Sequence, residues 1–308
     1  MKNMFDVPIL FLTYNKVDTT KKVLNAILKI NPKNLIISSD GGKNSLENKE
    51  IVELRKYFDK TLNSVSFEKF YNKNNLGCKA NVTNSIDKAF EKHEKLIILE
   101  DDTLPSKEFF IYTNKLLKLY KNYDKVNMIS GYNYLTKSKI SDDFFFSHYT
   151  NIWGWATWKN EWERRIELNK KSLNNFKNFN LNDIFHSEFE KNYFMQRFEE
   201  VVYDSLDTWD YGLVFSNFYQ KKLSIYPKYN LVKNIGLGHK NATHTNSYYK
   251  YLISTPNIRL NKFQSKKFKF IEPYINLKLE NKFYRKIIRK NTTYNKFVYQ
   301  ILKRLNRT

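Results

Sequence analysis

The sequence is poor in cysteine, glycine, proline and long apolar runs, and each shortage excludes a class of protein. Cys78 is the single cysteine among 308 residues, so no disulfide can form within the chain, which favours a reducing compartment. Eight glycines and six prolines are too few for a fibrous or low-complexity protein. No apolar run approaches the roughly 18 residues that a membrane-spanning helix needs. The run 7–13 is far shorter and lacks a cleavage site of small residues, so we expect no signal peptide and a cytoplasmic protein.

Three nucleotide-binding signatures are also missing. No Gly-x-Gly-x-x-Gly follows the first predicted strand, which excludes the usual dinucleotide-binding fingerprint. No Gly-x-x-x-x-Gly-Lys-Ser/Thr occurs, which excludes a P-loop enzyme. The glycine-rich basic loop that a sugar nucleotidyltransferase would carry after its first strand is absent as well.

Acidic residues are scarce relative to basic ones. The net charge is +22, and segment 262–308 alone carries 14 Lys or Arg against two Glu. Such an excess predicts an anionic partner. Apolar residues between 283 and 305 recur as in two short amphipathic helices, which favours docking of this basic tail on an anionic membrane surface at the inner face. The alternative is a solvated helical cap on the domain. No nucleic-acid-binding motif accompanies the charge, so we expect no nucleic acid partner.

The first part of the chain alternates short apolar runs with segments of helical periodicity. The predicted strands are 7–13, 35–39, 65–71 and 96–99, and the predicted helices are 18–30, 50–58, 79–92 and 105–120. This alternation predicts an α/β fold with a Rossmann-like, mostly parallel sheet flanked by helices. After residue 125 the rhythm changes, with strands expected at 128–131 and 223–227 and a helix at 188–206. We expect one catalytic domain over 1–260, divided into a 1–125 nucleotide-sugar half and a 126–260 acceptor half, followed by a 261–308 basic aromatic tail.

Carboxylates follow two of the predicted strands. Glu100, Asp101 and Asp102 come directly after the run 96–99, and Asp40 follows the run 35–39. Parallel strands bring these ends to one edge of the sheet, where α/β proteins bind ligands. Three adjacent acids repel one another unless a cation lies among them, and Mg²⁺ and Mn²⁺ prefer oxygen ligands. The alternative is a solvated acidic turn before a helix that begins at Pro105.

Together these segments resemble the donor-binding half of a GT-A-fold glycosyltransferase. The resemblance is carried by four motifs in order, namely 8-PILFLTYN-15, 38-SSDGG-42, Asn75-x-Gly77-x-x-Ala80-Asn81 and 98-ILEDD-102. The Glu-Asp-Asp triplet in place of Asp-x-Asp is similar to the N-acetylglucosaminyltransferase I family. So is the second half, where Trp153-Gly154-Trp155 is followed by Trp209-Asp210 and then by Gly238-His239. Each motif is short, and only their ordered combination over 7–245 is specific.

The resemblance implies a role for each matching position in the first half. Asp102 would ligate Mn²⁺ or Mg²⁺, Asp101 and Glu100 would hold the ribose and sugar of the donor, Asp40 would meet the base, and Thr13 and Asn15 would line the nucleotide pocket. A basic nucleotide contact in the first turn could come only from Lys16. The implied reaction is an inverting displacement on a nucleotide sugar, a UDP-sugar, with a glycan or lipid-linked acceptor as the second partner, in polysaccharide biosynthesis.

The second half would supply the base and the walls of the acceptor site. The resemblance implies that Asp210 is the general base, although Asp204 and Asp207 lie in the same acidic stretch. Four of the five tryptophans fall within 153–162, and either packing in the core or a substrate-lining role for Trp153 or Trp155 explains them. Trp209 would also line the acceptor or donor site, and it would keep water away from Asp210.

His239 lies near a pair of glycines, and it is either a late metal or phosphate ligand or a structural residue. Two other functions remain open: a sugar nucleotidyltransferase, and a non-catalytic membrane-surface or glycan-binding protein on the same scaffold.

Overall fold

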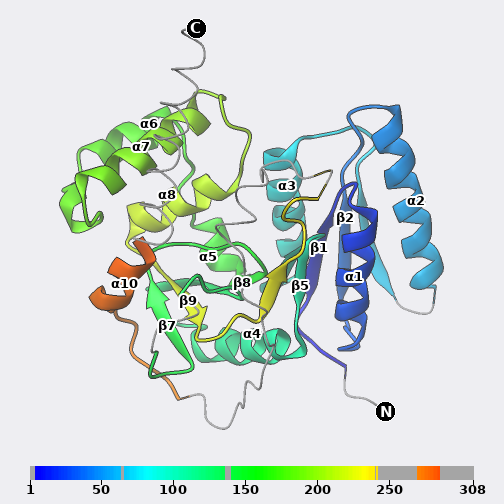
Figure 1. Ribbon diagram of the computed structural model, residues 1–308, viewed down its shortest axis with the longest axis horizontal. Helices are drawn as coiled ribbons and strands as arrows, with labels where there is room; N and C mark the ends of the chain where they lie inside the picture. Colours follow the sequence, from blue (N-terminus) through cyan, green and yellow to red (C-terminus); the bar gives the residue numbers. More distant parts are fainter. Residues whose placement is uncertain (1–3, 64–65, 136–139, 240, 242–268, 285–308) are drawn as a thin grey trace, which may run out of the picture.

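The computed structural model describes residues 4–63, 66–135, 140–239, 241 and 269–284. An eight-stranded sheet with the order β3-β2-β1-β4-β8-β6-β9-β7 crosses the molecule (Figure 1). Its strands are β1 (Ile9–Thr13), β2 (Leu35–Ser39), β3 (Phe67–Tyr71), β4 (Lys95–Glu100), β6 (Val126–Ser130), β7 (Phe144–Ser147), β8 (Trp155–Trp158) and β9 (Leu223–Pro227). Six of them run in one direction, and β8 and β7 oppose them. The predicted α/β class with a mostly parallel sheet is confirmed.

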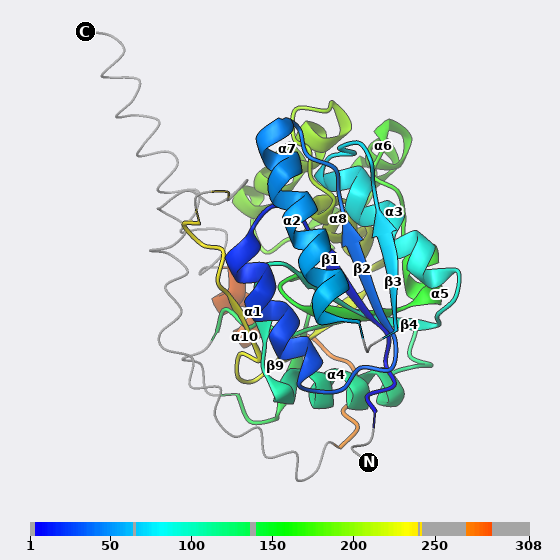
Figure 2. The ribbon, with the colours of Figure 1, turned by 90° about the vertical axis from the view of Figure 1, so that its right-hand side faces the viewer.

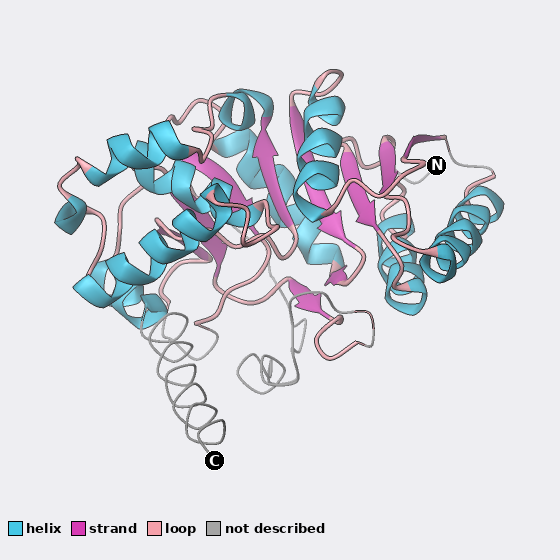
Figure 3. Cartoon of the chain, turned by 90° about the horizontal axis from the view of Figure 1, so that it is seen from above, coloured by secondary structure: helices cyan, strands magenta, loops and turns pink. Residues whose placement is uncertain are grey.

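Helices flank this sheet. They are α1 (Val17–Leu28), α2 (Ser45–Thr61), α3 (Cys78–Phe90), α4 (Lys107–Leu119), α5 (Lys159–Glu163), α6 (Lys170–Lys177), α7 (Glu188–Val202), α8 (Asp210–Gln220) and α10 (Leu277–Tyr284), with a 3₁₀ turn at Leu181–Asp183. Figures 2 and 3 show helices on both sides of the strands, with α1 and α2 on one face and α3 and α5 on the other.

Alternation along the first strand explains this two-sided packing. Ile9 and Phe11 point into a core that includes residues of α1, α2 and α4, whereas Leu10 and Leu12 point into a second core beneath α3. Successive strand residues face opposite sides, so a strand that is apolar at every position needs helices on both. All five residues of β1 are buried.

A third core fills the end of the molecule built by α6, α7 and α8. It contains Phe176, Phe198 and Phe215, together with Tyr226 from β9 and Leu279 from α10. The two predicted halves share one sheet, because β8 pairs with β4 in antiparallel register. The predicted boundary near residue 260 lies outside the described residues, as do residues 285–308, which hold most of the predicted tail helices.

A small second sheet brings a late segment back to the first half. In it β10 (Val232–Asn234) pairs antiparallel with β5 (Thr103–Pro105). The helix predicted to begin at Pro105 therefore begins later: Pro105 ends a strand, and Ser106 caps α4 by accepting a 3.2 Å hydrogen bond from Phe109 N. No helix in the described parts of the chain is both long and apolar enough to cross a bilayer.

Candidate active site

The carboxylates predicted to share one sheet edge do so. Thr13 is in register with Ser39 of β2, and Leu12 is in register with Glu100 of β4. The residues that follow these three strands, which include Lys16, Asp40 and Asp102, therefore emerge at the same edge. This confirms the geometric part of the prediction.

Lys16 is the cation that the acidic triplet requires. Its Nζ lies 2.7 Å from Asp102 Oδ2 and 3.2 Å from Asp101 Oδ1. Asp101 Oδ2 accepts a 3.0 Å hydrogen bond from Tyr14 N in the same turn. All three side chains of the ion pair are largely buried, at 7–15% exposure. The turn after β1 thus binds both aspartates through Lys16 and Tyr14. Local sequence patterns do not predict this contact, because 85 residues separate Lys16 from Asp101.

The pKa values follow from this burial. Burial and the neighbouring Asp102 raise the pKa of Glu100 to about 8. Burial also raises the pKa of Asp101, although the ammonium of Lys16 opposes the shift. Burial lowers the pKa of Lys16, but attraction to Asp101 and Asp102 outweighs it, and the net pKa lies well above the ordinary value. These shifts show that the three carboxyl groups crowd one another and that the single ammonium offsets their repulsion only in part.

Unpartnered oxygens at this edge fit a divalent metal ion. Asp102 Oδ1, Glu100 Oε1 and Asn15 Oδ1 are buried and have no hydrogen-bond partner among the described residues. Such oxygens cost free energy unless a cation or water reaches them. All three are hard donors of the kind that Mg²⁺ and Mn²⁺ prefer. Asp102 thus has one oxygen held by Lys16 and one without a protein partner, and a metal ion at this carboxylate stays a prediction.

Gly236 lies directly against the Asp102 carboxylate. A Cβ on Gly236 would come within 2.3 Å of Asp102 Oδ2 and 2.7 Å of Asp102 Cβ. The position of Gly236 beside Asp102 is fixed by the preceding residue, because Ile235 N donates a 2.8 Å hydrogen bond to Asp102 O. This bond continues the pairing of β10 with β5. The sequence gives no local signal for this contact.

Replacing Gly236 by alanine should push the Asp102 carboxylate away from Lys16. We expect about a tenfold or larger loss of Mn²⁺ affinity, measured by calorimetry, because displaced metal-site groups typically cost this much. The matched control is Gly212→Ala in α8, where a Cβ meets nothing within 4 Å and alanine suits a helix. Equal Mn²⁺ affinities of the two variants would contradict the assignment.

Asp40 holds a loop together. Its two carboxylate oxygens accept hydrogen bonds from Asn72 Nδ2, Asn75 Nδ2 and Leu76 N, each at 3.1 Å. The side chain is buried, with 4% of the residue exposed. These bonds fasten the 72–76 turn to the end of β2. The contact with a nucleobase that the sequence predicts stays a prediction, and the loop contacts are an additional role.

Asp40→Ala should therefore destabilise the fold. The change removes the acceptor of part-buried N–H groups of Asn72, Asn75 and Leu76, and we expect a loss of about 2 kcal/mol in the free energy of unfolding. Urea denaturation measures it. Asp183→Ala removes an exposed carboxylate as the control and should cost less than about 0.5 kcal/mol. Equal free energies of unfolding for Asp40→Ala and Asp183→Ala would show that the hydrogen bonds of Asp40 make no net contribution to stability.

Asp210 begins α8, and it interacts electrostatically with Glu100. Its Oδ1 accepts a 2.9 Å hydrogen bond from Tyr211 N and one from the hydroxyl of Thr208. Asp207 instead accepts hydrogen bonds from Cys78 N and Lys79 N, at 3.2 and 3.3 Å, at the start of α3. Both acids thus accept hydrogen bonds at the start of a helix, and the charge of Asp210 also contributes to the raised pKa of Glu100.

The tryptophans divide between core and surface. Trp155 and Trp209 are 1% and 6% exposed and stack on each other with ring centroids 5.7 Å apart. Trp153 is half-buried and packs edge-on against Tyr132, 4.8 Å away. Trp153 is therefore the one of the three predicted lining residues that keeps appreciable surface for a ligand.

The remaining predicted residues lie around the same edge. Thr13 is buried and donates a 2.8 Å hydrogen bond from Oγ1 to Ser38 O. His239 Nδ1 accepts a 3.0 Å bond from Asn241 N, so Nε2 carries the proton that reaches Asp18 Oδ1, 2.8 Å away. Both ring nitrogens are engaged in this arrangement, and a metal-ligand role for His239 stays a prediction.

Comparisons with known proteins are distant. No family model matches the sequence, and no curated protein matches it. A structure of S. aureus TarS is 13% identical, covering 46% of this chain and 24% of that one with a TM-score of 0.32. A structure titled S. aureus TarS 1-349 is 11% identical, covering 73% of this chain and 58% of that one, with a TM-score of 0.41. A UDP-glucose pyrophosphorylase complexed with UDP-glucose is 10% identical, covering 80% and 99%, with a TM-score of 0.38. This chain spans about a quarter of the first TarS chain and somewhat over half of the second. Similarities at this level say nothing about the chemistry of this chain.

Proposed function

We propose that this protein is a GT-A-type glycosyltransferase, metal-dependent and inverting, that moves a sugar from a UDP-sugar to a glycan or lipid-linked acceptor. One observation carries the proposal. Buried Asp101 and Asp102 share the ammonium of Lys16 at aligned strand ends, and Asp102 Oδ1 has no hydrogen-bond partner among the described residues. A diphosphate and its counter-ion need a site of this kind.

Each residue at the edge then has a task during transfer. Asp102 would hold Mn²⁺ or Mg²⁺, which when bound neutralises the charge that develops on the leaving diphosphate. Lys16, released from part of its contact with Asp102, would place its ammonium beside a phosphate oxygen. Glu100 and Asp101 would orient the ribose and the sugar, and Asp40 would meet the base.

Asp210 would act as the general base. The acceptor oxygen forms its bond to the anomeric carbon while the bond from that carbon to the diphosphate breaks, and the hydroxyl proton passes to the Asp210 carboxylate. A carboxylate within hydrogen-bond reach of an acceptor hydroxyl contributes about 10²- to 10⁴-fold in rate. One base suffices for inversion, because no enzyme nucleophile takes part.

The proposal is tested by screening nucleotide sugars for thermal protection and for hydrolysis in the presence of Mn²⁺. We expect one UDP-sugar to raise the melting temperature and to be slowly hydrolysed, and both effects to need the metal. If no nucleotide sugar protects the chain with or without Mn²⁺, the proposal is wrong. Formation of a nucleotide sugar and pyrophosphate from a nucleoside triphosphate and a sugar 1-phosphate would instead indicate a nucleotidyltransferase.

A further inference from the structure

A buried cluster of histidines and glutamates lies where the end of β7 meets α7 and α10, and it shares no residue with the carboxylate edge. His148 directly follows β7, His186 precedes α7, and Glu280 belongs to α10. One potential ligand atom from each of these three residues lies within 4.8 Å of the other two. Glu190 of α7 lies beside them, with its Oε1 3.9 Å from His148 Nε2. Segments separated by 132 residues in the chain thus meet at one point.

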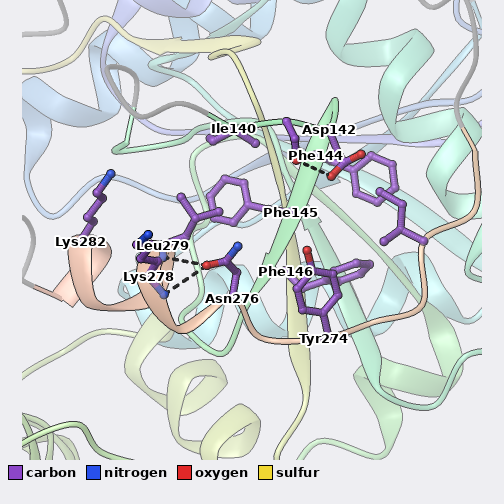
Figure 4. Close-up of a pocket in the computed structure, with 12 residues that line it drawn as sticks. Ile140, Asp142, Phe144, Phe145, Phe146, Tyr274, Asn276, Lys278, Leu279 and Lys282 are labelled. Carbon is purple, nitrogen blue, oxygen red and sulfur yellow. Dashed lines mark hydrogen bonds between the residues drawn. The ribbon is translucent and has the colours of Figure 1, made fainter.

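Helix α10 places Glu280 beside His148. Asn276 Oδ1 accepts hydrogen bonds from Lys278 N and Leu279 N, at 3.1 and 3.2 Å, and so caps the helix start, as Figure 4 shows. Leu279 lies close to Phe145 of β7 in the same view and shares its core. Glu280, the next residue, is completely buried.

His148 Nε2 and Glu280 Oε2 lack a hydrogen-bond partner among the described residues, and both belong to residues that are at least nine-tenths buried. Glu280 Oε1, by contrast, accepts from Ser147 Oγ, His148 N and His148 Nδ1, at 3.1, 3.0 and 2.6 Å. A histidine that donates one ring N–H to a carboxylate while its other nitrogen stays open has the arrangement of a metal-binding imidazole.

The charges of the cluster also favour a divalent cation. Glu190 and Glu280 are both 0% exposed and are surrounded by an aromatic core that includes Phe185, Phe194 and Phe218. One protonated imidazole leaves this pair with a net negative charge, whereas a dication with neutral histidines brings the sum to zero. Buried charge that stays unbalanced is costly.

We propose that His148, His186 and Glu280 bind a structural Zn²⁺ ion that fastens α10 to the body of the protein. Imidazole nitrogens combined with one carboxylate oxygen suit zinc better than Mg²⁺ or Mn²⁺, which prefer oxygen alone. Glu190, which accepts hydrogen bonds from His186 N at 2.7 Å and from the hydroxyl of Tyr149, orients the ligands. This site is separate from the one that involves Asp102 and does not depend on the proposed activity.

The test measures metal content and metal-dependent stability of the full chain. Protein purified from zinc-supplemented medium should contain about one zinc per chain by mass spectrometry. Stripping the metal with EDTA should lower the melting temperature by roughly 5 °C or more, and added Zn²⁺ should restore it. Glu280→Gln and His186→Ala should each weaken zinc binding at least about tenfold. Glu272→Gln and His93→Gln change the same residue types elsewhere and should bind zinc normally.

A second measurement covers variants that fail to fold. Co²⁺ added to the stripped wild-type chain should give the visible absorption of a tetrahedral site, and Zn²⁺ should abolish it. Zinc well below one per chain, together with a melting temperature that EDTA does not change, would overturn the proposal. That result would show that His148 pairs with Glu190 and Glu280 directly and that no metal ion lies among them.

Discussion

Replacing Asp102 by asparagine is expected to abolish metal-dependent turnover of the nucleotide sugar. The amide keeps the shape of the side chain but removes the negative charge that would hold the cation at the buried, unpartnered Oδ1. Losing stabilisation of the leaving group by several kcal/mol corresponds to about 10²- to 10⁴-fold in rate. An assay of UDP release, with and without the acceptor, measures this loss of rate for both donor hydrolysis and transfer.

The stability of Asp102→Asn separates a chemical effect from a structural one. The variant should remain folded, because the amide oxygen still accepts a hydrogen bond from Lys16. Asp183→Asn, at an exposed position, is the control and should keep full activity. If Asp102→Asn retains wild-type turnover at saturating Mn²⁺, the metal does not bind at this carboxylate.

Replacing Lys16 by methionine is expected to produce the largest loss of stability, and Mn²⁺ should reverse much of it. Without the ammonium, Asp101 and Asp102 become buried carboxylates with no cation between them. Breaking a buried ion pair in this way costs about 3 kcal/mol or more in the free energy of unfolding. For a chain of this size the melting temperature would fall by roughly 5 °C. Scanning calorimetry without Mn²⁺ measures the loss of stability, and scanning calorimetry with Mn²⁺ measures how much of that loss the metal reverses.

The matched control is Lys69→Met. Lys69 forms an ion pair with Asp59 at 2.6 Å, but both side chains are about half exposed, at 46% and 51%. Exposed pairs of this kind contribute less than about 1 kcal/mol. Mn²⁺ should stabilise Lys16→Met more than it stabilises the wild type or Lys69→Met. Equal stabilisation of all three would mean that the metal and Lys16 do not share the same carboxylates.

The strand ends illustrate how far the residues alone could predict the site. Short branched runs such as 96–99 are buried on both faces, and the polar residues directly after them fall at the sheet edge by geometry. Asp40, Asp101 and Asp102 were placed at one edge for this reason, and the register of β1, β2 and β4 confirms it. The later half was predicted less completely. The strands β7 and β8 and the helix α8 were missed because their apolar residues follow no clear period.

The sequence by itself determined the α/β class, the positions of the first four strands along the chain and the acidic edge. These depend on hydrophobic periodicity and on strand direction, which are local properties. Only the tertiary structure decided that Lys16 pairs with Asp101 and Asp102, that Gly236 returns to touch Asp102, and that Glu280 meets His148. Each of these contacts joins residues 85 or more positions apart. The two ionic contacts form because a buried charge needs a partner, and the glycine contact follows from the return of β10 to β5. No pattern of neighbouring residues records such a pairing.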